Sequence, residues 1–373
     1  MLSWIVFWGA AVALAYAYAG YPLLLLAQAR LRPRPVTRGP ATPSVSVVMT
    51  VYQGAGELAA KLDNLLALDW PAPLDIVVAC DGCSDDSAAI ARGYQDRGVR
   101  VLAFPERRGK AACVNDAVAA AHGELLVMTD VRQRIEPGAL RALAANFADP
   151  NVGVAGGELR FLAPDSDFAG SVDAYWRYET AIRGAESASG SVVGVSGALY
   201  AIRPVAFQPL PPGTVLDDVL VPMQAVREGY RVVLEPAAVA WDRASASPAL
   251  ERRRKLRTLA GNFQLLLLAP WLLLPGVNPL WLRFVSHKLL RLASPWLLLA
   301  LALAAVALYP THRFYRLVCV GLALALALVL AAPHSPALAR SLPVRVLAAF
   351  AHMNLFAAQA LFAFLRNRRL HLW

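Results

Sequence analysis

Long apolar segments occupy both ends of the chain, and a region of mixed polarity separates them. Residues 1–27 contain no charged side chain, and four arginines interleaved with prolines follow in the segment 28–42. An apolar run of this length predicts a transmembrane helix, and the cationic flank indicates that its C-terminal end lies in the cytoplasm. A cleaved signal peptide would carry its positive charge ahead of the apolar core, so the pattern favours a retained span over this alternative.

The region 43–262 alternates between two hydrophobic periodicities. Short β-branched runs predict buried strands, and apolar positions three or four residues apart predict helices between them. The expected strands are residues 45–51, 74–82, 99–104 and 124–130, and the expected helices are residues 57–68, 87–98 and 110–123. Elements that alternate in this way form a mostly parallel sheet with helices on both faces, so we expect one α/β domain here.

Lipid-like character returns after the α/β region. Residues 263–287 are apolar but contain three prolines and two tryptophans, which favours a segment lying in the headgroup boundary. Residues 288–365 hold three apolar runs of about spanning length, at 289–308, 317–332 and 344–365. Residues 366–373 form a basic tail.

The C-terminal runs raise a conflict of topology. If the α/β domain is cytoplasmic and all three runs cross the membrane, the arginine-rich tail would face outward, against the tendency of arginine to stay inside. Either residues 263–281 enter the bilayer or one of the later segments does not cross it. The hydrophobic pattern leaves both solutions open.

The composition indicates a membrane protein and favours one class of binding partner over another. The 373 residues are 57% hydrophobic and their mean hydropathy is +0.46, so part of the chain belongs in lipid. The formal net charge of +10 at pH 7 has many of its cations beside apolar segments, which favours a lipid bilayer over nucleic acid as the partner. The four cysteines include one C-x-x-C pair at 80–83 but lack zinc-ligand spacing, and we expect reduced thiols.

Polar side chains follow the expected strands, where ligands bind in a parallel sheet. Asp81 ends the second strand, Lys110 follows the third and Asp130 ends the fourth. The Asp81 carboxylate, with a glycine after it, suits hydrogen bonds to a base or ribose; the alternative task of capping the next helix fits Asp85 or Ser84 better. Lys110 would neutralise phosphate oxygens or be a solvated lysine.

The sequence GAGELA at residues 54–59 satisfies the G-x-G-x-x-G/A pattern of dinucleotide-binding folds. Two residues separate the first glycine from the expected strand, and an isolated pattern of this kind is weak. A nicotinamide enzyme, in which NAD binding would depend on Gly54 and Gly56, stays an alternative for this region.

Arg132 lies two positions after Asp130, where an enzyme that holds a diphosphate through a divalent metal often has a second carboxylate. The guanidinium would contact phosphate or point away from it. Farther along, Arg254 and Arg257 belong to the basic helical segment 251–264. Their charges would bind a leaving diphosphate or the membrane surface.

Together these pieces resemble the family 2 glycosyltransferases with a GT-A fold, in the membrane-integrated branch that includes cellulose and hyaluronan synthases. The resemblance covers about residues 43–265 and the arrangement of membrane segments. The motifs that carry it are VSVVMTVYQGAGELAAKLDNLLALDWP, CDGCSDD, RGKAACVNDAV, TDVRQRIEPGAL, GVSGALYAIR and LDDVLVPMQAVREGYRVVLEP. The resemblance implies an α/β GT-A domain with α-helical transmembrane segments at both ends.

The resemblance also implies roles for the acids. Asp81 would contact the nucleoside of a UDP-sugar or similar donor, and Asp130 matches the first acid of the D-x-D element, which coordinates Mg²⁺ or Mn²⁺ on the diphosphate. Asp218 matches the general base of the T-E-D element, since the dipeptide 229–230 follows at the family's spacing, and Asp217 takes the neighbouring acid's place. Inverting transfer needs such a base and a cation beside the leaving group.

The basic segment departs from the family pattern. Arg257 matches the arginine of the Q-x-x-R-W element, but Arg254 occupies the glutamine position and Thr258 the tryptophan position. The missing tryptophan weakens a transfer of processive polymer synthesis from the cellulose synthases. Arg132 in place of the second D-x-D acid predicts an altered site that still binds metal, because the diphosphate supplies further oxygen ligands.

Two further segments bear on the acceptor. Glu179, Arg183 and Glu186 have helical spacing, which predicts a salt-bridged face. The glycines of residues 189–203 would let the backbone pass close to the reacting groups, in keeping with the family's acceptor loop.

The sequence thus predicts a multi-pass protein of the cell inner membrane whose cytoplasmic domain transfers a sugar from a nucleotide-sugar donor to a saccharide or lipid-linked acceptor. Transfer of a single sugar to polyprenyl phosphate is the second enzymatic hypothesis. A catalytically inactive nucleotide-sugar sensor is a third, suggested by Arg132.

Overall fold

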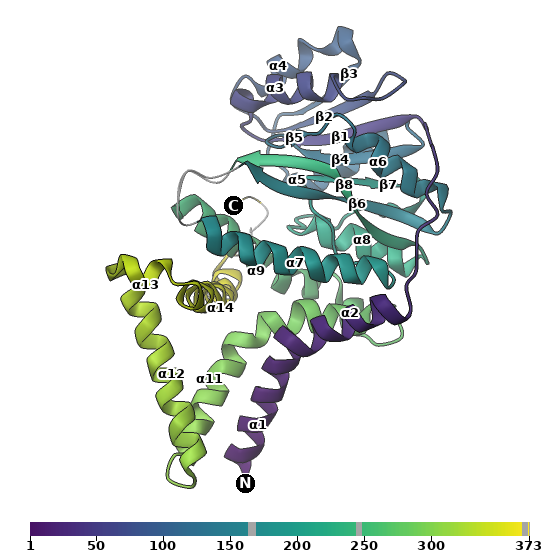
Figure 1. Cartoon of the computed structure of the whole chain (residues 1–373). Coiled ribbons are helices and arrows are strands. Elements are labelled where there is room, and N and C mark those ends of the chain that lie inside the picture. The colour runs from purple at the N-terminus through teal and green to yellow at the C-terminus, as the bar shows by residue number, and fades with distance from the viewer. Residues whose placement is uncertain (163–168, 244–247, 368–371, 373) are drawn as a thin grey trace.

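The computed structural model describes residues 1–162, 169–243, 248–367 and 372 of the chain. Figure 1 shows an α/β domain at the top and helices from both ends of the chain extending below it. Two long helices, α7 (Ala169–Ala188) and α9 (Pro248–Leu268), lie between these parts. The expected α/β domain with apolar helices at both ends is confirmed.

An eight-stranded sheet forms the centre of the α/β domain, with strand order β3-β2-β1-β4-β7-β6-β8-β5. Strands β1 to β4 pair in parallel, whereas β7 runs antiparallel to β4 and β6. β6 and β8 are parallel, and β5 is antiparallel to β8. The strands are β1 (Val45–Val51), β2 (Asp75–Asp81), β3 (Val99–Phe104), β4 (Leu125–Asp130), β5 (Arg134–Ile135), β6 (Val152–Leu162), β7 (Leu199–Ile202) and β8 (Arg231–Arg243).

The first four strands agree with the sequence prediction to within one residue at each end. The expected helix at 87–98 is instead broken into two short pieces, because Gly93 and Gly98 follow them and Gly98 has a φ of 87°. The helices and 3-10 turns of the domain are α3 (Ala55–Leu66), α4 (Ser87–Arg92), η2 (Gln95–Arg97), α5 (Lys110–Ala120), α6 (Ala139–Ala145), η3 (Asn146–Ala148), η4 (Pro204–Ala206) and α8 (Asp217–Arg227).

Alternate side chains of the strands enter two hydrophobic layers. Val47 and Met49 of β1 belong to a layer that includes α3 and α6. Val48, on the opposite face of the same strand, belongs to a layer that includes α5, α8 and α9. Because both faces are covered, the strands are apolar along most of their length, as expected for a largely parallel sheet.

Four helical segments of the described chain are long and apolar enough to cross a membrane: Leu2–Leu31, Trp281–Leu308, Arg313–His334 and Leu342–Arg366. The first extends four residues past the expected end at residue 27. In chain order they consist of α1 (Leu2–Ala15), η1 (Tyr16–Gly20) and α2 (Tyr21–Leu31); α10 (Trp281–Phe284), η6 (Val285–Leu289) and α11 (Leu290–Leu308); α12 (Arg313–Ala331) and η7 (Ala332–His334); and α14 (Leu342–Arg366). The 3-10 turn η5 (Pro270–Leu273) follows α9, and α13 (Pro336–Arg340) precedes α14.

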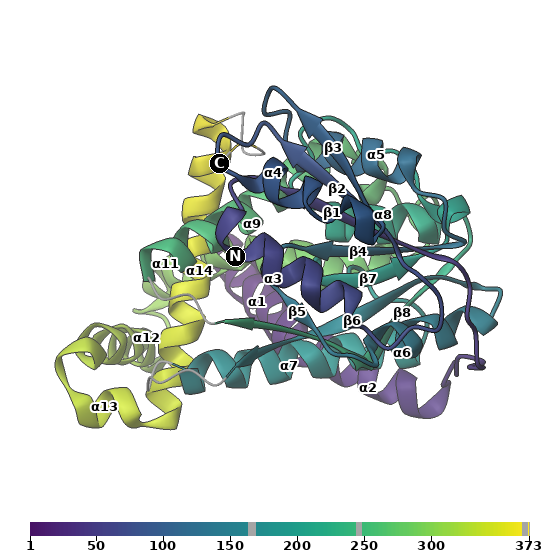
Figure 2. The ribbon, with the colours of Figure 1, turned by 90° about the horizontal axis from the view of Figure 1, so that it is seen from above.

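The helix α14 runs across the other membrane helices. α1, α11 and α12 extend downward in Figure 1, where α14 is seen nearly along its axis, and the view from above in Figure 2 shows α14 at full length. Phe364 stacks on Phe263 of α9, with ring centroids 6.1 Å apart. Asn354 accepts a hydrogen bond over 2.8 Å from Ser294, near the start of α11. α14 therefore lies at the level where α11 begins, beside the α/β domain.

Two acidic residues of α7, Glu179 and Glu186, bind the membrane helices. Glu186 accepts a hydrogen bond from the Tyr21 hydroxyl over 2.6 Å and lies 2.9 Å from Nδ1 of His287. Glu179 lies 3.1 Å from Nε2 of the same histidine and pairs with Arg291. The sequence prediction of a face bridged along one helix was incomplete, because spacing along α7 cannot reveal which distant helix covers it.

Candidate active site

The carboxyl ends of β2, β1 and β4 lie at one edge of the sheet, and the predicted acids gather there. β1 pairs with β2 on one side and β4 on the other, so Asp81 and Asp130 flank it at the same edge. α8 begins with Asp217 and Asp218, and α5 begins with Lys110. Parallel pairing thus collects residues that are distant in sequence.

Lys110 joins two of these carboxylates. Its Nζ lies 3.0 Å from Oδ1 of Asp130 and 3.0 Å from Oδ2 of Asp217. Burial works to lower the pKa of the ammonium, but the negative charges of Asp130 and Asp217 prevail and hold that pKa well above its usual value. Lys110 is therefore a positive charge held between two carboxylates, although its side chain is still 28% exposed.

Asp218 adjoins this cluster. Burial, reinforced by the charge of Asp217, raises the pKa of the Asp218 carboxyl to about 6. The backbone N–H of Val195 donates to the Asp218 carbonyl over 2.9 Å and so ties the glycine-rich segment to α8. A carboxylate whose pKa lies near neutral pH is suited to taking a proton from a substrate.

The glycine-rich segment passes close to the charged groups, as the sequence predicted. A Cβ atom at Gly197 would lie 3.7 Å from Nζ of Lys110 and 3.8 Å from Oδ2 of Asp218. At Gly194 a Cβ would lie 3.3 Å from the carbonyl oxygen of Asp218. Side chains at these positions would take up the space between the segment and the side chains of Lys110 and Asp218.

Asp81 shapes the loop that precedes Lys110. Its carboxylate accepts the backbone N–H groups of Arg108 over 2.6 Å and Gly109 over 2.9 Å, and the residue is only 4% exposed. Gly82 has a φ of +59°, and a Cβ there would lie 2.4 Å from the backbone of the same loop. Asp81 thus positions Lys110, and its contact with a nucleoside stays a prediction.

The first backbone N–H groups of the GAGELA segment already donate hydrogen bonds within the protein. The Gly54 N–H donates to the Ser87 hydroxyl over 3.0 Å, and the Ala55 N–H donates to the Asp85 carboxylate over 2.9 Å. Asp85 also accepts the N–H of Ser87, the first residue of α4, over 3.2 Å, although the N-cap position itself is occupied by Asp86. These donors are not directed at a pyrophosphate, which argues against a dinucleotide site at the start of α3.

Arg132 binds an acid of another strand. Its guanidinium donates to Oδ2 of Asp242, on β8, over 2.9 Å. Burial and the nearby charge of Arg132 lower the pKa of Arg254 on α9, so these two cations lie close together. Arg257 is partly buried on the same helix. Arg132 therefore faces the α9 side of the site, and its contact with phosphate stays a prediction, as does that of Arg254 and Arg257.

The metal predicted at Asp130 can be tested against the side chains present. The Asp130 side chain is 38% exposed and thus reachable, although Lys110 contacts one of its oxygens. Within the described ranges, no three acidic, histidine or cysteine side chains form a metal cluster. The set fits a hard cation that arrives with a donor, because a diphosphate supplies the remaining oxygen ligands.

Lys61, which the sequence pattern did not single out, lies buried beside Asp130. It is 2% exposed, and its Nζ donates to the Thr129 hydroxyl over 2.9 Å. Burial lowers its pKa to about 7, even though the charge of Asp130 opposes this change. A signal was present, because Lys61 follows Leu58 by three positions and precedes Leu65 by four, which places it on the apolar face of α3.

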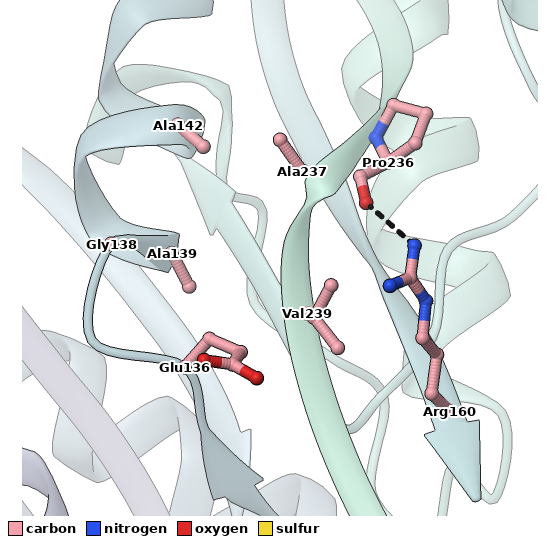
Figure 3. Close-up of a pocket in the computed structure, with 8 residues that line it drawn as sticks. All are labelled: Glu136, Gly138, Ala139, Ala142, Arg160, Pro236, Ala237 and Val239. Carbon is pink, nitrogen blue, oxygen red and sulfur yellow. Dashed lines mark hydrogen bonds between the residues drawn. The ribbon is translucent and has the colours of Figure 1, made fainter.

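A surface hollow of about 390 Å³ lies between α6 and the strands β6 and β8. Figure 3 shows Arg160 at its rim, donating to the Pro236 carbonyl over 3.4 Å, and Glu136 on the opposite side. None of the predicted site residues lines it. The hollow is therefore separate from the cluster of acids around Lys110.

Comparison with known families covers the whole α/β domain. The family described as "Glycosyltransferase like family 2" matches residues 42–261. This match displaces the dinucleotide-binding interpretation of residues 54–59.

One solved structure is similar over nearly the full chain. The mannosyltransferase PcManGT from Pyrobaculum calidifontis, in complex with GDP-Man and Mn²⁺, superposes with a TM-score of 0.72 and 24% sequence identity. The superposition covers 96% of this chain and 98% of that chain. The likeness shows a common fold over nearly the whole chain.

Two curated relatives match shorter regions. The succinoglycan biosynthesis protein ExoU of Rhizobium meliloti (strain 1021) is 34% identical over 105 residues, which are 28% of this chain and 30% of ExoU. The poly-beta-1,6-N-acetyl-D-glucosamine synthase of Staphylococcus aureus (strain MSSA476) is 22% identical over 204 residues, 53% of this chain and 49% of the synthase. The matched regions span about half or less of each relative.

Proposed function

The chain belongs to the family 2 glycosyltransferases, and from this membership we propose a membrane-bound inverting enzyme that transfers a sugar from a nucleotide-sugar donor to a polysaccharide or glycolipid acceptor. One observation carries the proposal. Lys110 joins Asp130 and Asp217 at 3.0 Å each, directly beside Asp218. A cation for a leaving group and a carboxylate for a proton therefore occupy the same edge of the sheet.

In this proposal Asp218 is the general base. The acceptor hydroxyl gives its proton to the Asp218 carboxylate while its oxygen forms a bond to the anomeric carbon of the donor. The bond from that carbon to the diphosphate oxygen breaks on the opposite face, and the nucleoside diphosphate leaves with the electron pair. The pKa of about 6 makes Asp218 mostly ionised at neutral pH and still basic enough to accept the proton.

Lys110 would stabilise the leaving group. Its ammonium already bridges two carboxylates and is held at the start of α5 by the loop that Asp81 fixes. A positive charge positioned before the reaction acts on the developing negative charge without reorganisation. Asp217 would keep Lys110 in place, and Arg254 and Arg257 would approach the diphosphate from α9.

We propose Asp130 as the protein ligand of a divalent cation, Mg²⁺ or Mn²⁺, that enters with the donor. The cation would neutralise charge on the departing diphosphate. Mn²⁺ is present with GDP-Man in the similar mannosyltransferase structure, which supports this assignment. UDP-sugars are the donors suggested by the family resemblance, and GDP-mannose is the one suggested by that structure.

We propose an inner-membrane location with the α/β domain in the cytoplasm. The arginines that follow the first apolar helix support this orientation. α1 with α2, α10 with α11, and α12 would cross the bilayer, and α14 would lie along its cytoplasmic face, because it runs across these helices beside the α/β domain. Three crossings keep the arginine-rich tail inside and remove the conflict that the sequence raised.

Transfer by membranes containing the protein tests the proposal. A panel of labelled UDP-sugars and GDP-mannose is supplied, and the products are sized. We expect one donor to yield a labelled product and Asp218→Asn to lower turnover about 10²- to 10⁴-fold. Asp69→Asn is the control, since Asp69 is an exposed acid paired with Arg141. If Asp218→Asn transferred sugar at the full rate, Asp218 could not be the general base.

A further inference from the structure

Arg283 is a buried cation at the start of the second apolar helical segment. It belongs to α10, within the segment Trp281–Leu308, and it is 9% exposed. A guanidinium carries five N–H donors and no acceptor, and a charge in a membrane segment is costly unless polar groups surround it. The partners of Arg283 therefore indicate what this side chain holds in place.

The guanidinium binds the turn that follows α7. Its Nη1 donates to the carbonyl oxygens of Glu186 over 2.5 Å and Ser191 over 2.7 Å. Its Nη2 donates to the carbonyl oxygen of Ser189 over 3.1 Å and to the hydroxyl oxygen of the same serine over 2.8 Å. Four acceptors within residues 186–191 thus meet on one planar group. Because that group is rigid, the contacts hold the turn in one arrangement.

The turn depends on contacts from outside α7, because a helix ends with carbonyl groups that have no partner within it. The Glu186 carbonyl accepts from Arg283, and the Ala188 carbonyl accepts the N–H of Arg34 over 2.8 Å. Arg34 lies just past the first apolar helical segment. A cation at this end of a helix is also favoured by the helix dipole. Residues beside two membrane segments therefore complete the end of α7.

The turn leads directly into the glycine-rich segment beside Asp218. Gly197 follows Ser191 by six positions, and a Cβ at Gly197 would lie 3.8 Å from Oδ2 of Asp218. Between these positions, the N–H of Val195 donates to the Asp218 carbonyl over 2.9 Å. So short a stretch, bound at both ends, would carry a shift of the turn to the reacting edge.

We propose that Arg283 is a positioning residue for the transfer reaction. The inference rests on the proposed function and deepens it: Arg283 fixes where the glycine-rich segment begins, and through it the room left for the acceptor hydroxyl at Asp218. A residue of a membrane segment thereby sets the geometry of a site in the α/β domain. A lysine could not take this place, because one ammonium lacks the planar fork that reaches all four acceptors.

The variant Arg283→Lys tests the assignment in the full-length protein, since it keeps the positive charge at the end of α7. With the donor identified in the transfer panel, we expect kcat to fall about tenfold to a hundredfold, because a small misplacement near the reacting groups is costly. The KM for that donor should stay the same. The proposed donor ligands Lys110 and Asp130 lie on α5 and β4, away from the turn.

Hydrogen exchange of the purified protein measures the anchoring without turnover. Peptides that cover residues 189–197 should exchange about tenfold faster or more in Arg283→Lys, because charge-assisted hydrogen bonds to the turn are lost. Peptides of β1 should exchange as in the unaltered protein. Arg283→Met, which removes the charge as well, should exchange faster still over residues 189–197; if this variant does not fold, Arg283→Lys carries the test.

Arg100→Lys is the matched control. Arg100 also binds the end of a helix: its Nη1 donates to the carbonyl oxygen of Ala120, the last residue of α5, over 2.6 Å. It pairs in addition with Asp75 over 2.7 Å. This variant loses the same kind of contact at the end of α5 that lies away from Lys110. It should lower the melting temperature and leave both kcat and the exchange of residues 189–197 unchanged.

Three outcomes would overturn the proposal. A kcat of Arg283→Lys equal to that of the unaltered protein would do so directly. An equal fall in kcat in Arg100→Lys, or faster exchange throughout the α/β domain, would make Arg283 a contributor to stability alone. A higher donor KM with an unchanged kcat would assign it to donor binding. Absence of transfer by the unaltered protein would contradict the proposed function, whereas the exchange measurement would still decide whether Arg283 anchors the segment.

Discussion

Arg132 donates a hydrogen bond to Asp242 over 2.9 Å, so β8 holds the guanidinium that stands where the family's D-x-D element has its second acid. Asp130 is left with Lys110 as its ion-pair partner. The cation that the family resemblance predicts must therefore share Asp130 with an ammonium. This arrangement makes the metal dependence of the enzyme a sensitive test of the site.

Asp130→Asn should weaken the uptake of metal with the donor. The amide carries no charge and is a poorer ligand for a hard cation, so we expect the half-saturating Mn²⁺ concentration to rise roughly tenfold or more. Calorimetry of Mn²⁺ binding with a nucleoside diphosphate measures this without turnover. Unaltered metal affinity in Asp130→Asn, with Asp69→Asn as reference, would place the cation elsewhere.

The pH profile should report the state of Asp218. A general base acts only when deprotonated, so kcat/KM should fall as the pH drops through about 6, the raised pKa of this carboxyl. Asp217→Asn removes the neighbouring negative charge, and the acid limb should then move to lower pH by roughly one pH unit. A limb that stays in place in this variant would show that Asp217 does not act on the titrating group.

Gly197→Ala should obstruct the site without unfolding the domain. The new methyl group would lie 3.7 Å from Nζ of Lys110 and 3.8 Å from Oδ2 of Asp218, in ordinary contact with both, so it takes up room that a substrate needs. We expect kcat/KM to fall about tenfold to a hundredfold. The melting temperature of the variant should equal that of the unaltered protein. Gly138→Ala, with open space around the added carbon, is the control.

Reporter fusions should reveal three membrane crossings. A cytoplasmically active reporter should be silent when joined after Thr311, between α11 and α12, and active when joined after Arg340 or Asn367. The reporter should be active after both Arg340 and Asn367 if α14 lies along the membrane surface, because both ends of the helix are then in the cytoplasm. Opposite signals after Arg340 and Asn367 would mean that α14 crosses the bilayer.

The strand ends show which features of the fold could be predicted from the sequence. Periodicity located β1 and β3 to the residue, and the rule that ligands bind beyond parallel strands selected Asp81 and Asp130. The strand positions agree with the structure because strand alternation and turn residues act over a few neighbouring positions, whereas the roles of Asp81 and Asp130 stay predictions. The partner of Arg132 escaped prediction, since Asp242 lies on a strand whose place in the sheet depends on chain crossovers.

The buried lysine of α3 and the acids of α7 show a different limit. Lys61 interrupts an apolar face, which is visible in the sequence, but its contact with Thr129 requires the helix to be docked on the sheet. Glu186 has helical spacing to its neighbours, yet it binds Tyr21 and His287 from the two membrane segments. Local patterns indicate that a polar group needs a partner and cannot say which one.

The sequence by itself determined the α/β class, the apolar helices at both ends and the choice of candidate acids at the strand ends, because hydrophobic period and turn propensity are local properties of the chain. Only the tertiary structure decided that Lys110 joins Asp130 to Asp217, that Arg132 turns to Asp242, and that α14 lies across the other helices. Those relationships arise from packing between segments distant in sequence, where burial and charge select one partner among many.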